Sequence, residues 1–115
     1  MRYMCLVYVD PALASAASPE RWRQIQSACL AFNEDLRRSG HYIASNALAE
    51  SNTATTLRKR SGKVIVIDGP FAETKEVLGG FFLIEASDRD EALAIAGRSP
   101  LASMGSIEIR ETAGF

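Results

Sequence analysis

The spacing of hydrophobic positions changes several times along this chain, and each spacing predicts a different element. Residues 2–9 carry apolar side chains at nearly every position, so that both faces of an extended segment are apolar. A strand of this kind is typical of a sheet that is covered on both sides. Asp10 and Pro11 end the run. We therefore predict a first strand over residues 2–9 and two layers that cover it.

The next pattern has the period of a helix. Ser18 can cap its start, Pro19 suits the first turn, and Gly40 can adopt the left-handed conformation that ends a helix. Apolar residues recur at steps of three and four, at Trp22, Ile25, Cys29, Phe32 and Leu36. This stripe predicts a helix over residues 19–39 that packs one face on the sheet.

The middle of the chain favours extended structure. Residues 42–48 read as a strand, and the threonine-rich segment 53–59 reads as another. The turn dipeptide Ser61-Gly62 precedes residues 63–67, so we predict an antiparallel hairpin. Because Val64-Ile65-Val66-Ile67 is β-branched and apolar throughout, we expect a buried strand there.

The last third repeats the order strand, helix, strand. Gly79-Gly80 leads into residues 81–86, which are apolar on both faces. Ser87 or Asp88 can cap a short helix from Asp88 to about Ala96. Residues 106–111 alternate apolar and charged side chains, as in a final strand with one wet face.

Two strand-helix-strand units predict one α+β domain over residues 1–115, a ferredoxin-like sandwich with helices on one face of a mainly antiparallel sheet. The other face of the first strand and of residues 81–86 is also apolar and needs a cover. A second copy of the sheet is the simplest cover, so we expect a homodimer whose sheets face each other.

Composition removes several classes of function. The 115 residues are 47% hydrophobic, contain no apolar stretch long enough for a membrane span, and carry a net charge of -1. We expect no membrane and no nucleic-acid partner. The apolar N-terminal run is short and lacks a cleavage site, so we expect a cytoplasmic protein without a secretion signal.

The two cysteines, Cys5 and Cys29, are too few for a disulfide framework or a zinc site, and we expect buried free thiols. No nucleotide-binding loop, metal-ligand spacing or serine nucleophile elbow is present, so the sequence predicts no cofactor and no metal.

The segment Asp68-Gly69-Pro70-Phe71-Ala72-Glu73-Thr74-Lys75-Glu76 is the best candidate for a ligand site, because Gly-Pro must turn the chain directly after a strand. Asp68 can act as an acid/base group or hydrogen-bond the turn that it opens. Phe71 can plug the loop against the core or stack on a ligand.

Other residues complete the predicted site. Lys75 can close over an anionic substrate, with Gly79-Gly80 as a hinge. Tyr8 and Asp10 become cavity walls if the end of the first strand lies beside the Asp68 loop.

The Asp68–Glu76 motif, Leu78-Gly79-Gly80-Phe81-Phe82, Glu91-Ala92-Leu93, Pro100 and Ile107-Glu108-Ile109-Arg110 together resemble the YCII-related proteins of the DGPF group. The resemblance covers nearly the whole chain and implies a dimeric α/β barrel built from ferredoxin-like subunits. Some relatives are similar to enzymes that eliminate chloride from hydroxylated ring compounds with a histidine and an aspartate. Asp68, Pro70 and Phe71 match the motif, whereas the histidine of the enzymatic relatives has no clear counterpart in this chain, because His41 lies at a helix-to-strand connection where the family usually has an apolar residue.

Three functions stay open from the sequence. The first is a cofactor-independent lyase or isomerase that acts on a small oxygenated or aromatic compound, with Asp68 as acid/base and Tyr8 or Lys75 assisting. The second is a dimer that binds or senses the same ligand without turnover. The third is an interaction protein linked to the transcription machinery. The basic cluster Arg58-Lys59-Arg60 with Lys63 reads as a solubilising hairpin tip.

Overall fold

The computed structural model describes residues 1–115 and contains a four-stranded antiparallel sheet. Its strands lie in the order β2-β5-β1-β6. Their bounds are Arg2–Val9 for β1, Tyr42–Ala47 for β2, Val77–Glu85 for β5 and Gly105–Glu111 for β6. This arrangement confirms an α+β protein compatible with the ferredoxin-like fold.

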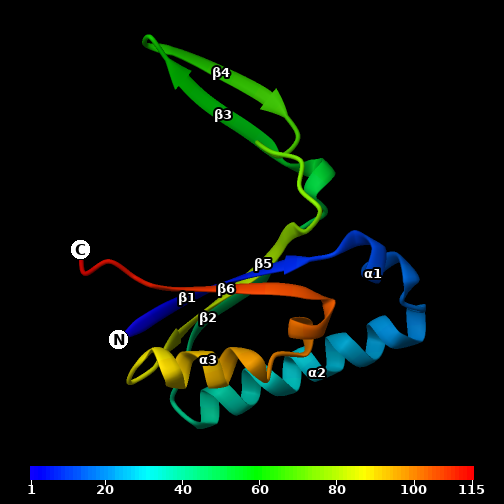
Figure 1. Cartoon of the computed structure of the whole chain (residues 1–115), viewed down its shortest axis with the longest axis vertical. Coiled ribbons are helices and arrows are strands. Elements are labelled where there is room, and N and C mark those ends of the chain that lie inside the picture. Colours follow the sequence, from blue (N-terminus) through cyan, green and yellow to red (C-terminus); the bar gives the residue numbers. More distant parts are fainter.

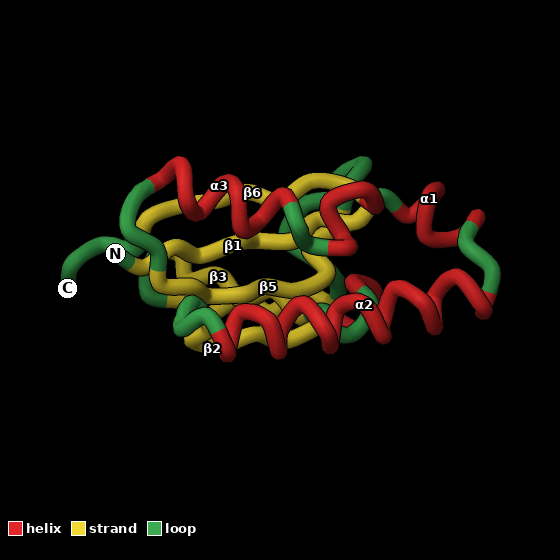
Figure 2. The backbone as a smooth tube through the Cα atoms, turned by 90° about the horizontal axis from the view of Figure 1, so that it is seen from below, coloured by secondary structure: helices red, strands yellow, loops and turns green.

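Helices cover one face of this sheet, as Figures 1 and 2 show. The long helix α2, Pro19–Arg38, and the shorter helix α3, Arg89–Gly97, lie side by side beneath the strands. A six-residue helix, α1, Pro11–Ala16, joins β1 to α2 and is an element that the sequence patterns did not reveal. None of the helices combines the length and apolarity that a membrane span requires.

The core lies between the sheet and the two larger helices. The alternate β1 residues Tyr3, Cys5 and Val7 face the helices and are buried. Phe32 of α2 meets Phe82 of β5 edge to face, with ring centroids 5.6 Å apart. The apolar stripe expected on the long helix therefore packs on the sheet, as its period required.

The ends of α2 follow from local chemistry. The Ser18 side chain accepts a hydrogen bond from the backbone N–H of Arg21 at 3.1 Å, which caps the first turn. At the other end Gly40 adopts φ 79°, and the His41 N–H donates to the Leu36 carbonyl at 2.9 Å. Both predicted boundaries are thus correct to within one residue.

The predicted hairpin forms, but it stands apart from the sheet. Strand β3, Thr55–Arg60, pairs antiparallel with β4, Lys63–Asp68, around a turn in which Ser61 and Gly62 have φ values of 51° and 76°. We call β3, β4 and their turn the arm. It projects on the side of the sheet opposite the helices (Figure 1).

The prediction that Val64–Ile67 is a buried strand is wrong for the single chain. These four side chains and Leu57 are 43–64% exposed, because no other element packs on either face of the arm. The β-branched run sets the strand conformation, but burial depends on a neighbour that this chain alone does not supply.

The face of the sheet away from the helices is uncovered. The β1 residues Met4, Leu6 and Tyr8 point to this face, opposite Arg110, Glu108 and Ser106 of β6 in the strand register. Leu83 of β5 is the register partner of Met4 on the other side. The expected second apolar face therefore exists, with charged residues along its β6 margin.

Gly79-Gly80 lies inside a strand rather than before it. Strand β5 starts at Val77, and a bulge opposite Val7 and Tyr8 accommodates the glycine pair. A Cβ on Gly80 would come within 2.9 Å of the Asn46 carbonyl oxygen. These glycines thus permit close strand packing, and they do not form the flexible hinge proposed from the sequence.

Candidate functional site

A pocket of about 740 Å³ lies where the arm joins the sheet, and we call it the arm-base pocket. Strand β1 contributes Tyr8, and β5 contributes Val77 and Leu78. The chain entering the arm supplies residues 48–51 and 53–56, and the chain leaving it supplies Pro70, Phe71, Ala72 and Thr74. The Asp68 loop and the end of the first strand therefore meet, as the predicted site required.

Backbone hydrogen bonds fix the loop that borders this pocket. Gly69 adopts φ 100°, a left-handed conformation that glycine tolerates best, and its N–H donates to the Ala54 carbonyl at 2.7 Å. The Thr56 hydroxyl donates to the Gly69 carbonyl at 2.8 Å. Together these bonds aim Pro70 and Phe71 toward the pocket, and Gly69 acts through the backbone.

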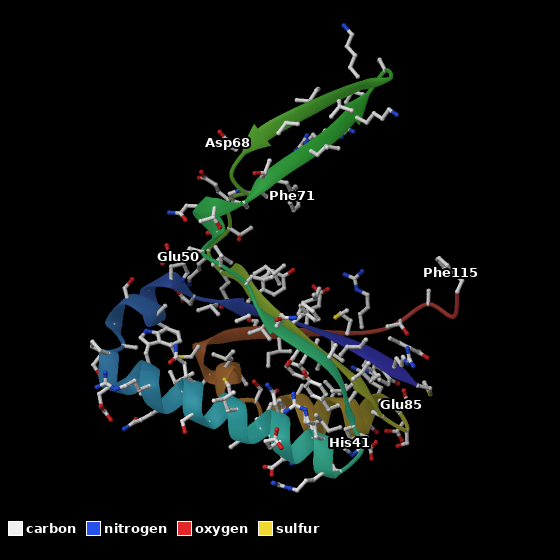
Figure 3. All side chains as sticks on the ribbon, turned by 180° about the vertical axis from the view of Figure 1, so that it is seen from behind. His41, Glu50, Asp68, Phe71, Glu85 and Phe115 are labelled. Atoms are coloured by element: carbon white, nitrogen blue, oxygen red, sulfur yellow. The ribbon has the colours of Figure 1, made fainter.

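Asp68 itself does not line the pocket. It is the last residue of β4, lies opposite Thr55 in the arm, and is exposed. The expected Asx hydrogen bond from its carboxylate to the turn is absent, and the Gly69 and Thr56 bonds hold the turn instead. The exposed Asp68 carboxylate thus lies outside the pocket, on the opposite side of the arm base from Phe71 (Figure 3).

Phe71 lines the pocket and is 77% exposed, so the interpretation of this ring as a plug against the core is wrong for the single chain. A large aromatic ring exposed at the edge of a cavity is a suitable surface for stacking on a flat ligand.

Glu50 is a lining residue that the sequence patterns missed. It precedes a 3-10 turn, Ser51–Thr53, and lines the same cavity as Tyr8. The sequence places Glu50 in a polar break between two strands, a signal that marks a loop but not a cavity. The pocket therefore contains one carboxylate and one phenol, with Asp68 nearby outside it.

Two further predicted residues lie outside the lining. Asp10 accepts a hydrogen bond from the Ala12 N–H at 2.9 Å, which caps α1. Lys75 is exposed in the connection from the arm to β5. Neither residue borders the arm-base pocket, so a ligand-binding role for Asp10 or Lys75 stays a prediction.

His41 lies far from the arm. Its Nδ1 is 2.8 Å from the carbonyl oxygen of Glu85 and 3.8 Å from Oε1 of Glu91, at the opposite end of the molecule from Asp68 (Figure 3). A single chain therefore does not bring His41 and Asp68 together as a catalytic pair.

A second hollow, of about 700 Å³, lies between α2 and the edge of the sheet near β2. Its walls are mainly apolar and include Trp22, Ile25 and Phe81. Cys29 is its one ionisable side chain, and burial raises the pKa of that thiol. This groove offers contact area but no acid/base group at neutral pH, so the arm-base pocket is the better candidate site.

The structure gathers no group of three or more His, Cys, Asp or Glu side chains of the kind that holds a metal ion. Cys5 is fully buried, and burial raises the pKa of its thiol to about 12. Both cysteines are free. At neutral pH Cys5 is therefore a protonated core residue.

The fold and the pocket define an α+β protein with a cavity of the size that holds a small molecule. The YCII-related domain family matches residues 1–115, and the chain belongs to this family. It is 39% identical over 115 residues to an uncharacterized protein of Rhizobium meliloti (strain 1021), with 98% of this chain and 93% of the relative covered.

A similar solved structure is 5-chloro-2-hydroxyhydroquinone dehydrochlorinase (TftG) from Burkholderia phenoliruptrix AC1100, in complex with 2,5-dihydroxybenzoquinone. The TM-score is 0.56 with 17% sequence identity, covering 98% of this chain and 94% of the other. At this identity the likeness shows the fold alone.

Proposed function

We propose that the protein binds a small oxygenated or aromatic compound in the arm-base pocket and converts it as a cofactor-independent enzyme of the lyase or isomerase type. The observation that carries this proposal is the composition of the pocket, in which an exposed aromatic ring, a phenol and a carboxylate border one cavity. Such a mixture of apolar walls and few polar groups is common in small-molecule sites.

The walls fit a flat, oxygenated ligand. Phe71, Pro70 and Leu78 offer apolar contact to a ring. The Tyr8 hydroxyl can donate a hydrogen bond to a ligand oxygen, and the threonine oxygens of the arm base can accept from ligand hydroxyls. These threonines are Thr53, Thr55, Thr56 and Thr74.

Two carboxylates serve the proposed proton transfer. Glu50 lines the cavity, and Asp68 ends β4 opposite Thr55, which also lines it. In an elimination or isomerisation, one carboxylate takes a proton from the substrate and a nearby acid returns it to the leaving group or to another atom of the substrate. Tyr8 is the nearby hydroxyl that can hydrogen-bond the oxygen on which charge develops.

A ligand-binding or sensing role without turnover is the second candidate. It is favoured by the exposure of Asp68 and its position outside the lining. Both candidates share the same pocket, so binding is tested first and turnover second.

The dehydrochlorinase with the similar fold supplies the class of compound to test. Calorimetric titration with 2,5-dihydroxybenzoquinone and a panel of hydroxylated benzenes measures binding. We expect Phe71→Ala to weaken binding about fivefold, since a lost ring contact is worth roughly 1 kcal/mol. Phe115→Ala, at an exposed terminal ring, is the matched control. Equal affinity in all three proteins would exclude the pocket as the binding site.

Turnover is then measured as product formation from each compound that binds. We expect Asp68→Asn or Glu50→Gln to lower kcat by about 100-fold, the usual contribution of a general acid or base, while binding persists. Asp90→Asn on α3 is the control for loss of an exposed carboxylate. Unchanged kcat in both variants would exclude these two carboxylates as the acid or base, and no turnover of any compound that binds would leave the binding role alone.

Our other proposals follow from the sequence. The apolar sheet face with Met4, Leu6 and Leu83 supports a homodimer whose sheets face each other. We also propose membership of the DGPF group, a cytoplasmic location, and no nucleic-acid partner.

A further inference from the structure

The arm carries apolar surface that is not buried within this chain. Leu57, Val64 and Val66 lie on one face of the hairpin, and Ile65 and Ile67 lie on the other. Both faces are exposed. An isolated two-stranded hairpin is marginally stable in water, and an exposed apolar ribbon of this kind normally marks a contact with another protein surface.

The shape of the molecule points the same way. Its radius of gyration is 16.0 Å, whereas a compact chain of this length would have about 13 Å. The excess comes from the arm, which extends away from the sheet on its uncovered side (Figures 1 and 3). A partner that fills the space beside the arm would restore a compact assembly.

Opposite charges lie at the two ends of the arm, and they indicate the kind of partner that the arm would bind. The tip carries four cations, Arg58, Lys59, Arg60 and Lys63. Four carboxylates surround the base, Glu50, Asp68, Glu73 and Glu76, together with one cation, Lys75. Every ion pair within the chain lies in the sheet and helices, and none involves the tip or the base of the arm.

We propose that two copies of this chain pair their arms antiparallel, so that the basic tip of each arm closes the arm-base pocket of the other copy. Running from base to tip, the arm is acidic, then apolar, then basic. Such a sequence is complementary to itself when a two-fold axis passes through the middle of the paired arms. The apolar middles of the two arms then contact each other, and the basic tip of each arm contacts the acidic base of the other arm.

The exposed apolar area supplies part of the interface of such a pair. A Val, Leu or Ile side chain offers on the order of 100 Å² of apolar surface, so the five arm residues leave roughly 300 Å² exposed per copy. The apolar middles of two paired arms would therefore bury at most about 600 Å² in total, and the contacts of each tip with the partner's base add to this area. The same axis turns the uncovered sheet faces toward each other.

This pairing would bring positive charge to the pocket. No Lys, Arg or His lines the arm-base pocket within the chain. The partner's tip would bring a cluster of cations to a mouth that already holds Tyr8 and Glu50. The completed site therefore favours a ligand with an anionic oxygen, such as a carboxylate or a phenolate. This part of the inference rests on the proposed function, whereas the pairing of the arms does not.

A charge exchange tests the pairing. We expect sedimentation equilibrium to show that Arg58→Glu/Arg60→Glu and Glu73→Lys/Glu76→Lys each weaken the dimer at least tenfold, because each places like charges at the contact. An equimolar mixture of the two variants should associate as a heterodimer, and a chain that carries all four changes should dimerise with itself. Arg21→Glu/Arg98→Glu, two exposed sites without ion pairs, is the control and should leave the wild-type dimer intact.

Three results would overturn the pairing. The first is a wild-type chain that is monomeric, and the second is a pair of tip and base variants that dimerise as tightly as the wild type. The third is a mixture of the two variants that associates no more strongly than either variant alone. Circular dichroism of each variant verifies folding, because both pairs of changes lie outside the sheet and its core.

Cross-linking distinguishes antiparallel from parallel arms. The variant Lys59→Cys/Glu73→Cys should form a disulfide-linked dimer on mild oxidation, whereas Lys59→Cys alone should not. Efficient linkage of Lys59→Cys alone would place tip against tip and would contradict the antiparallel arrangement. Both variants are made with Cys29→Ser to remove the partly accessible native thiol.

The anion preference of the pocket is measured with 4-hydroxybenzoate and its neutral analogue 4-hydroxybenzyl alcohol. We expect the wild-type dimer to prefer the carboxylate at least tenfold. The chain with all four changes should dimerise but lose that preference, because the two new glutamates cancel the charges of Lys59 and Lys63 and leave its tip without net positive charge. A retained preference would contradict closure of the pocket by the partner's tip. Failure of the wild type to bind either compound would overturn closure and count against the proposed function, while the sedimentation result would still decide the pairing.

Discussion

The body of the molecule, formed by the main sheet and its helices, and the arm use similar residues in opposite ways. In the body, Ile84 of β5 is fully buried beneath the helices, whereas Ile65 of the arm is 43% exposed. Both residues lie in antiparallel strands with apolar neighbours. The difference lies in the second layer, since α2 and α3 cover β5 and nothing in the chain covers the arm.

This contrast separates what local sequence decides from what neighbours decide. A β-branched run selects the extended conformation in both regions, but it stabilises the fold only where another surface removes it from water. The body supplies its own second layer. The arm leaves that surface available, and its charges lie where a second copy would meet them.

Truncation of a buried leucine should separate the two regions most clearly. Leu36 of α2 is fully buried, so Leu36→Ala should lower the free energy of unfolding by about 2–5 kcal/mol. Leu57→Ala in the arm should change the chain's own stability by less than about 0.5 kcal/mol. Urea unfolding is followed by Trp22 fluorescence at several protein concentrations. The concentration dependence separates the contribution of self-association from the free energy of unfolding of the single chain. Equal losses in the two variants would mean that the arm belongs to the cooperative core.

Glycine substitutions sharpen the same comparison at the level of the backbone. A Cβ at Gly105 would lie 2.0 Å from the Tyr8 carbonyl oxygen, so Gly105→Ala must force β6 away from β1 and should cost about 1–3 kcal/mol. In the arm turn, a Cβ at Gly62 meets nothing within 4 Å. The positive φ of Gly62 should limit the cost of Gly62→Ala to about 1 kcal/mol, confined to the hairpin.

Amide hydrogen exchange locates these two effects. Gly105→Ala should speed exchange across β1 and β6, and Gly62→Ala should speed it only in β3 and β4. Faster exchange throughout the body of the Gly62→Ala protein would show that the two regions unfold together.

The sequence predicted the body well because its signals are local and repeated. The helix stripe from Trp22 to Leu36, the cap at Ser18 and the stop at Gly40 each depend on neighbouring residues, and all appear at the expected places. The helix α1 was missed because its six residues carry no apolar period, although Asp10 and Pro11 form a cap and first turn.

The site was predicted only in part, because it depends on how the arm leaves the sheet. The motif at Asp68 correctly indicated a turn, and Tyr8 and Phe71 do meet at one cavity. The sequence could not place Glu50 there, since that contact joins segments about twenty residues apart across the hairpin. It also could not show that Phe71 stays exposed, because burial is a property of the whole assembly.

The pH dependence of stability provides the most gradual test of the body. Burial raises the pKa of Cys5 to about 12, whereas an unfolded cysteine titrates near pH 8.5. The folded state therefore binds more protons than the unfolded state between these values. The stabilisation is fully present below about pH 8.5 and is lost as the pH rises toward 12, at about 1.4 kcal/mol per pH unit.

We expect the free energy of unfolding, measured in urea between pH 8 and pH 10.5, to fall more steeply for the wild type than for Cys5→Ala. Lysine and tyrosine titrations are common to both proteins and cancel in the difference. Leu57→Ala keeps the buried thiol and should retain the wild-type slope, because the arm does not contact the core around Cys5. Parallel curves of unfolding free energy against pH for wild type and Cys5→Ala would mean that solvent reaches Cys5 in β1. The contrast between a solvent-excluded body and a solvent-exposed arm would then fail.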